Sequence, residues 1–82
     1  MSATIADTIY QALSAQIVTG DLQAGEKLRQ DHIARDFDTS HVPVREALLR
    51  LEAHGLAISE PRRGTRVSAL NPSEIREVIE MR

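Results

Sequence analysis

A helical segment between two turn signals, running from Ser40 to Gly55, is the part of this sequence that most restricts its fold. Serine is a favoured N-cap and glycine a common helix stop, and Pro43 is tolerated because it falls in the first turn. One side of the segment is apolar at helical spacing and carries Val44, Ala47, Leu48 and Leu51. The other side carries His41, Val42, Arg45, Leu49 and Glu52. The pattern predicts a helix from about His41 to His54 that packs through one side only, with Leu49 a misfit unless a neighbouring element covers it.

A shorter helix is predicted directly before this one. It starts near Asp31, and Ile33, Ala34 and Phe37 give it one apolar face over about two turns. Residues 38–40, Asp-Thr-Ser, then favour a tight turn, in which Ser40 is the expected N-cap of the longer helix. A short helix, a tight turn and a longer helix form a helix-turn-helix.

A first helix of about 15 residues is predicted near the N-terminus. Its apolar residues recur every four positions, at Ile5, Ile9, Leu13 and Ile17, with Ala6, Ala12 and Val18 beside them. Gly20 is its expected stop. Residues 20–30 contain two glycines and isolated leucines, which predicts a turn followed by a short extended segment.

Two short strands are predicted after Gly55. Leu56 and Ile58 fall in the first, Val67 and Ala69 fall in the second, and residues 61–65 connect them. Three helices followed by such a hairpin are the element order of a winged helix-turn-helix. The predicted fold class is therefore α+β, mainly α, with three helices plus a two-stranded β-hairpin wing.

Residues 1–70 are expected to form one domain, because 82 residues suffice for one small core. Residues 71–74, Asn-Pro-Ser-Glu, are typical of a new helix start, and Ile75, Val78 and Ile79 follow at helical spacing. That helix has barely begun at Arg82. We therefore expect residues 71–82 to start a linker or the first helix of a further domain absent from this chain, which would make the chain a fragment.

The charge of the chain is unevenly distributed. The formal net charge is −2, which by itself argues against a polyanionic partner. Residues 1–26 contain no Lys or Arg, however, whereas residues 41–66 carry five Arg against three Glu. Nine of the ten cations are Arg, whose planar fork suits phosphates and guanine edges. The local charge therefore favours nucleic acid in the middle of the chain.

The composition also bears on location. Without cysteine the chain has no disulfide, thiol nucleophile or thiolate zinc site, which fits a reducing cytoplasm. Its apolar stretches reach three or four residues, against about 20 for a membrane span, and the N-terminus lacks the pattern of a signal peptide. A cytoplasmic location without a membrane partner is expected.

Three segments resemble one known family. They read GDLQAGEKL, SHVPVREALLRLEAHGL and RRGTRVSAL, and the resemblance covers the chain from Ile9 onward. In these segments the chain is similar to the N-terminal domain of GntR-type transcription regulators, and among them to the FadR-like (FCD) group. The resemblance implies sequence-specific binding of double-stranded DNA as a homodimer on a near-palindromic operator. It also implies control by a small metabolite held in a separate C-terminal domain.

Two positions depart from the family's usual pattern. The family usually has Gly before the N-cap of the recognition helix and Arg just after it, where this sequence has Asp38 and His41. A neutral imidazole makes one hydrogen bond at each nitrogen, so His41 is not expected to grip guanine as an Arg would.

The candidate DNA-binding residues fall in two groups. On the helix, Arg45 is the first choice for base readout, and the alternative is a surface Arg paired with Glu46 or Glu52. His41 and Val42 are expected to contact base edges, and the alternative is that they merely begin the helix. Ser40 caps the helix and bonds a phosphate, and Pro43 sets the helix start. In the wing, the candidates are Arg62, Arg63, Gly64, Thr65 and Arg66, against a solvated basic turn. Arg29 resembles a family position near phosphate, and Arg50 is a further candidate unless it is a surface or ion-paired residue.

Other functions find little support. His32, His41 and His54 lack the i, i+3 or i, i+4 spacing of helical metal ligands, so neither a metal nor another cofactor is expected. No nucleophile stands beside a base, so the chain is not expected to be an enzyme, and two aromatic residues are few for stacking RNA bases. The remaining alternative is a winged helix used as a protein-interaction module. Cations both on the free helix side and at the hairpin tip favour DNA over that alternative.

Overall fold

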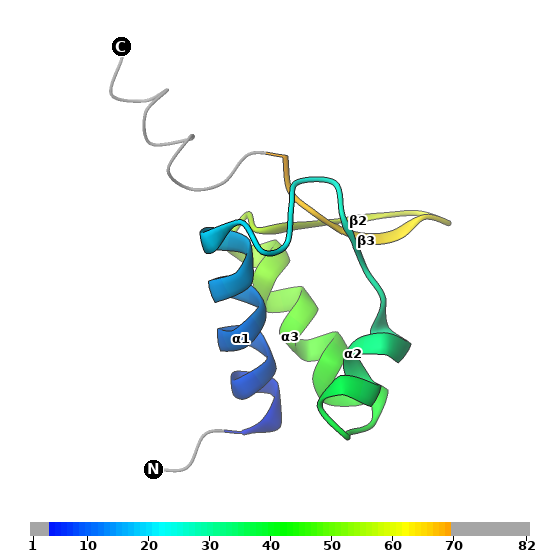
Figure 1. The fold of residues 1–82 in the computed structure, drawn as a ribbon. Coiled ribbons are helices and arrows are strands. Elements are labelled where there is room, and N and C mark those ends of the chain that lie inside the picture. The colour runs from blue at the N-terminus through cyan, green and yellow to red at the C-terminus, as the bar shows by residue number, and fades with distance from the viewer. Residues whose placement is uncertain (1–3, 70–82) are drawn as a thin grey trace.

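The computed structural model describes residues 4–69 of the chain. Its elements are α1 (Ile5–Thr19), β1 (Lys27–Leu28), α2 (Gln30–Asp36), α3 (His41–Ala53), β2 (Ala57–Glu60) and β3 (Gly64–Val67). Helices α1 and α2 both pack against α3, and β2 and β3 form a hairpin beyond the end of α3 (Figure 1). The predicted winged helix-turn-helix is confirmed. The helix predicted from residue 71 onward lies outside the described residues.

The sheet has three strands where a two-stranded hairpin was predicted. Its order is β1-β3-β2, and β1 pairs antiparallel with β3 through Lys27 opposite Arg66 and Leu28 opposite Thr65. The sequence indicated that residues 27–28 are extended, but two residues are too few to show a strand period. Their partner lies nearly forty positions away along the chain.

One apolar core joins the three helices to the sheet. Its most deeply buried residues are Ile9, Val44, Ala47 and Leu51, each with 0% of its surface exposed. The four-residue spacing of α1 and the packing side of α3 were thus predicted correctly. Ile5 and Val18 lie outside this core, with 52% and 71% of their surfaces exposed.

The prediction of which residues in the first hairpin strand face the core was wrong. Ala57 faces the core opposite Val67, so its neighbour Ile58 points outward and is 49% exposed. Leu56 is buried because it lies where the chain leaves α3, and its N–H donates to the carbonyl of Leu51 at 2.8 Å. Ala69 lies beyond the end of β3 and is exposed. The strand period therefore begins one residue later than the sequence suggested.

Both ends of α1 are closed by local hydrogen bonds. Asp7 N–H donates to Thr4 Oγ1 at 3.0 Å and Thr4 N–H donates to Asp7 Oδ2 at 3.1 Å, which is a capping box. Gly20 adopts a φ of +92°, a conformation that glycine reaches without strain, and its N–H donates to the carbonyl of Ile17.

A polar cluster ties α1 to α3 at the surface. Arg50 forms a salt bridge with Asp7 and stacks on Tyr10, with its guanidinium carbon 4.3 Å from the ring centre. The hydrogen bond from Thr4 N–H, together with the bond from Arg50, holds the pKa of Asp7 below its usual value of 3.8. Ionised Asp7 therefore stabilises the fold.

We expect this contribution to depend on pH. A carboxyl group whose pKa is lower in the folded state than in the unfolded state stabilises the protein at pH values above its unfolded-state pKa. This stabilisation is lost as the pH falls through the folded-state pKa. The wild-type chain should therefore have a higher Tm than Asp7→Asn at neutral pH, and the difference should shrink below about pH 4. Thermal unfolding of both chains at several pH values measures it. A difference that stays constant down to about pH 2 would contradict the role assigned to the ionised carboxylate.

Candidate nucleic-acid interface

The turn between α2 and α3 places the start of α3 at the surface. Thr39 N–H donates to the carbonyl of Ala34 at 2.9 Å, which closes the turn against the end of α2. Asp38 adopts a φ of +52°, in the left-handed region. Glycine suits this conformation best and aspartate tolerates it better than most residues, which explains how Asp38 replaces the expected glycine.

Helix α3 has the two sides that its sequence predicted. Val44, Ala47, Leu48 and Leu51 are buried, whereas His41, Val42 and Arg45 are exposed. Val42 keeps 74% of its surface exposed and Leu49 58%, so no described element covers Leu49. The first two turns of α3 thus present a cation, an imidazole and an apolar side chain to the solvent.

Arg45 makes no salt bridge with any residue of the described range 4–69. The alternative that pairs it with Glu46 or Glu52 therefore finds no support in the structure. A guanidinium without an internal partner keeps all five of its N–H donors for an external one.

Ser40 occupies the N-cap position of α3, but its side chain makes no capping hydrogen bond. The predicted position is correct and the predicted bond is wrong. An N-cap oxygen accepts from the N–H of the second or third helical residue. Here the third is Pro43, which has no N–H, and the N–H of Val42 at the second position is not bonded to Ser40 either. Thr4 of α1 has Asp7 at the third position and does form the bond. The hydroxyl of Ser40 remains available to an external acceptor.

The two N-caps should respond differently to alanine. Thr4→Ala should lower the free energy of unfolding by about 1 kcal/mol because it removes a capping bond. Ser40→Ala should change it by less than about 0.5 kcal/mol, whereas the predicted phosphate contact of the hydroxyl implies weaker DNA binding by this variant. Urea unfolding and duplex titration of both variants separate these effects. Equal destabilisation by the two substitutions would contradict the difference.

The tip of the wing is a tight turn from Glu60 to Arg63, closed by a hydrogen bond of 3.1 Å from Arg63 N–H to the carbonyl of Glu60. Pro61 stands at its second position and Arg62, with a φ of +67°, at its third. These are features of a type II turn, whose third position normally takes glycine or asparagine. Arginine adopts this conformation at a cost in backbone strain that glycine would not have.

The three wing arginines differ in their partners. Arg66 forms a salt bridge with Glu60, across the hairpin from it. Arg62 and Arg63 are exposed and make no salt bridge with residues 4–69. Two cations at the tip thus have no partner among the described residues, while Arg66 fastens the two strands together.

Arg62→Gly should have opposite effects on stability and binding. Relief of the left-handed arginine should raise the free energy of unfolding by about 0.5–1 kcal/mol. A phosphate contact by Arg62, as the sequence predicts, implies that this variant binds duplex more weakly and that the slope of log affinity against log salt concentration is reduced by about 0.9. Arg62→Lys is the matched control, since it keeps the charge. Unchanged affinity of the glycine variant would show that Arg62 does not contact DNA.

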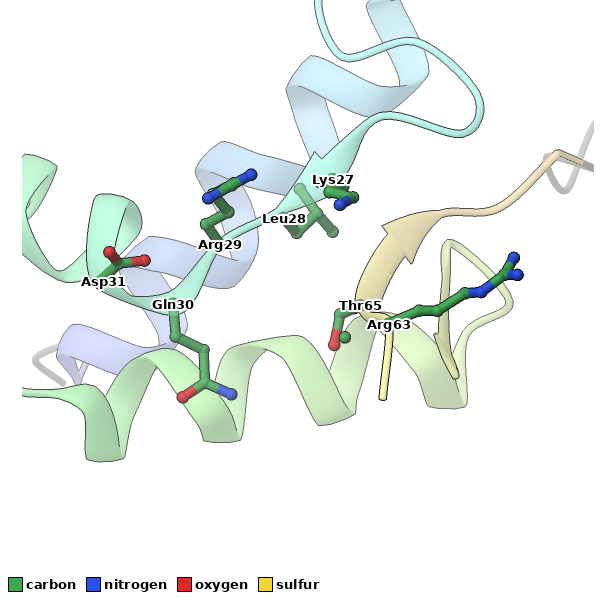
Figure 2. Close-up of a pocket in the computed structure, with 8 residues that line it drawn as sticks. Lys27, Leu28, Arg29, Gln30, Asp31, Arg63 and Thr65 are labelled. Atoms are coloured by element: carbon green, nitrogen blue, oxygen red, sulfur yellow. The ribbon is translucent and has the colours of Figure 1, made fainter. Parts of the chain in front are cut away.

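Arg29 and Arg50, the two more distant candidates, lie in different surroundings. Arg50 is occupied by Asp7 and Tyr10, so the ion-paired alternative describes it correctly. Arg29 is the exposed N-cap of α2 and borders a hollow of about 320 Å³ between α2 and the wing, which we call the corner hollow (Figure 2). Its lining residues are Lys27, Leu28, Arg29, Gln30, Asp31, Arg63, Gly64 and Thr65. Lys27 and Gln30 were not predicted as site residues, because only the pairing of β1 with β3 brings them beside the wing.

Neither a candidate metal site nor a membrane-spanning helix occurs among the described residues. Residues 4–69 contain no group of three His, Cys, Asp or Glu side chains placed to hold a metal ion. Within the same range, no helix is long and apolar enough to cross a membrane.

Solved structures of known proteins share this fold. A GntR-family regulator from Pseudomonas syringae pv. tomato superposes with a TM-score of 0.78 at 34% identity, over 94% of this chain and 32% of that one. Escherichia coli McbR/YncC superposes with a TM-score of 0.80 at 25% identity, over 98% of this chain and 38% of that one.

Curated sequences and a family profile agree with the structural likeness. The probable D-xylose utilization operon transcriptional repressor of Paenarthrobacter nicotinovorans is 35% identical over 79 residues, 96% of this chain and 35% of that protein. The uncharacterized HTH-type transcriptional regulator YdhC of Bacillus subtilis is 30% identical over 73 residues, 89% of this chain and 33% of that protein. The chain thus spans about a third of these relatives. The profile described as "Bacterial regulatory proteins, gntR family" matches residues 5–67, so the chain belongs to the gntR family of bacterial regulatory proteins.

Proposed function

We propose that this chain is the DNA-binding part of a transcription regulator and that α3 enters the major groove. B-DNA's major groove, about 12 Å wide, admits one helix. Arg45 reads a base edge, and His41 and Val42 contact the neighbouring bases, with Val42 suited to a thymine methyl group. This mechanism requires no cofactor in the chain.

The observation that carries this proposal is the exposure of Arg45 without a partner in the described range, on a helix side that packs against nothing there. Arg62 and Arg63 add free cations at the wing, which reaches the flanking backbone or minor groove. Ser40 and Arg29 supply further phosphate contacts, and Pro43 sets the start of α3. Family membership supports this assignment, since the P. nicotinovorans relative is named a repressor.

The complete regulator, in our proposal, acts as a dimer of FadR-like type. Two copies of α3 related by a two-fold axis read the two halves of a near-palindromic operator, spaced by about one turn of DNA or slightly less. Residues 1–70 form the DNA-binding domain, and residues 71–82 begin the link to an effector domain that binds a small metabolite. The regulator works in the cytoplasm.

A selection experiment tests this function. The chain is titrated at several salt concentrations against a random duplex pool, and the retained duplexes are sequenced. We expect a two-fold motif and an affinity that falls steeply as salt rises. Failure to bind duplex at low salt, even after the chain is artificially dimerised, would contradict the proposal and favour the protein-interaction module.

A further inference from the structure

The corner hollow contains two polar side chains that the structure leaves without a partner. Gln30 and Thr65 are half-buried, and neither side chain hydrogen-bonds within the described part of the chain. In Figure 2 both extend toward the side on which α3 lies, whereas Arg29 extends away from it. The hollow therefore offers an amide and a hydroxyl as unused donors.

The strand register explains why Thr65 points this way. Thr65 stands opposite Leu28, and residues that oppose each other in a sheet share a face. Leu28 is buried in the core, so Thr65 faces inward at the edge of the core rather than toward the outer face of the sheet. Lys27 and Arg66 oppose each other on that outer face.

The charge of the hollow favours an anion. Lys27, Arg29 and Arg63 contribute to its lining, against the single carboxylate of Asp31. In Figure 2 the guanidinium groups of Arg29 and Arg63 extend away from the space between Gln30 and Thr65, so these charges surround the hollow rather than point into it. Burial opposes ionisation of Asp31, but hydrogen bonds from the N–H groups of Asp31 and His32, with nearby positive charge, outweigh it and hold its pKa below 3.8. The carboxylate stays ionised at neutral pH, and the lining still carries a net positive charge.

The place of the hollow matches the path of one DNA strand. Helix α2 and the tip of the wing lie on the same side of α3 (Figure 1). Residues from the start of α2 and from the wing both line the hollow. A single sugar–phosphate strand separates a major groove from the adjacent minor groove. With α3 in one groove and the wing at the other, that strand passes over the hollow.

We propose that the corner hollow seats one phosphate of this strand, with the Gln30 amide and the Thr65 hydroxyl donating hydrogen bonds to its oxygens. Lys27, Arg29 and Arg63 supply the surrounding positive charge. This inference rests on the proposed function and adds Gln30 and Lys27 to the interface. The bound phosphate fixes the wing at a set distance from α3.

The test combines variants of the protein with neutral phosphates in the DNA. Gln30→Met and Thr65→Val remove each donor at nearly constant size, and Ser59→Ala is the control, since Ser59 opposes Thr65 across the hairpin but lies outside the hollow. Each chain is titrated against the selected duplex and against copies that carry one methylphosphonate at successive positions. We expect each donor variant to bind the unmodified duplex about tenfold more weakly, and Ser59→Ala to bind like the wild type.

The decisive result is the coupling between protein and DNA. At one and the same methylphosphonate position, both donor variants should bind the modified duplex as tightly as the wild-type chain binds it, so that their tenfold difference in affinity disappears. Deficits that persist at every position, or that vanish at different positions, would overturn the proposal while leaving the DNA-binding function intact. A wild-type chain that binds no duplex would overturn both.

Two further measurements complete the test. Lys27→Gln should reduce the slope of log affinity against log salt by about 0.9, whereas Gln30→Met should leave it unchanged because it removes no charge. Inorganic phosphate alone is titrated against the chain while the amide signals of Gln30 and Thr65 are followed. Saturation by free phosphate, combined with no response of these signals to the duplex, would assign the hollow to a free anion and overturn the proposal.

Discussion

Replacing Arg45 by alanine is expected to weaken binding to the selected operator by about 1–3 kcal/mol and to relax one operator position. The reason is that Arg45 lies on the exposed side of α3, makes no salt bridge with a described residue and, in the function proposed above, donates to a base edge. Affinity for random duplex should change much less, since that affinity depends mainly on phosphate contacts. Paired titrations on operator and random DNA measure the two effects.

Arg35→Ala is the matched control for this substitution. It removes the same charge from an exposed helical position, at the end of α2. We expect a small loss that is equal on operator and random DNA. Equal losses on both duplexes for Arg45→Ala as well would contradict the assignment of Arg45 to base readout.

Leu48→Ala and Leu49→Ala should differ sharply, although the two residues are neighbours in α3. Leu48 is 2% exposed in the core, and its truncation should lower the free energy of unfolding by about 2.7–5 kcal/mol through lost burial and a residual cavity. Leu49 is 58% exposed, and its truncation should change stability by less than about 0.5 kcal/mol. Urea unfolding of both variants measures the difference.

This pair also tests the orientation of α3. In a domain of this size, the loss expected for Leu48→Ala is a large part of the total stability. Comparable destabilisation by Leu49→Ala would mean that its side of the helix packs against another element and does not face DNA.

Helices were the part of the fold that sequence reasoning predicted best. The pattern in α1 predicted both its length and the stop at Gly20, because helical periodicity and caps are local signals. The pairing of β1 with β3 had no local signal. The inward side of β2 depended on how the chain leaves α3 at Leu56, which is a matter of tertiary packing.

The candidate site was predictable to a similar extent. Spacing alone indicated that Arg45 is exposed on α3, and the local sequence indicated the basic tip of the wing. The fate of Arg50 required knowledge of how α1 lies against α3, since Asp7 is 43 positions away. Pro43, three residues after Ser40, was a sequence signal that one of the two usual capping donors is missing, but the sequence did not show that the N–H of Val42 is unused as well.

The most direct test of the central claim, that α3 and the wing form one DNA-binding surface, is a map of backbone amide shifts. The isotope-labelled chain is titrated with the selected duplex, and the perturbed residues are placed on the structure. We expect the largest shifts in residues 40–45 and 62–65, and small ones along the outer side of α1. Shifts concentrated on α1, or none at the start of α3, would contradict the claim.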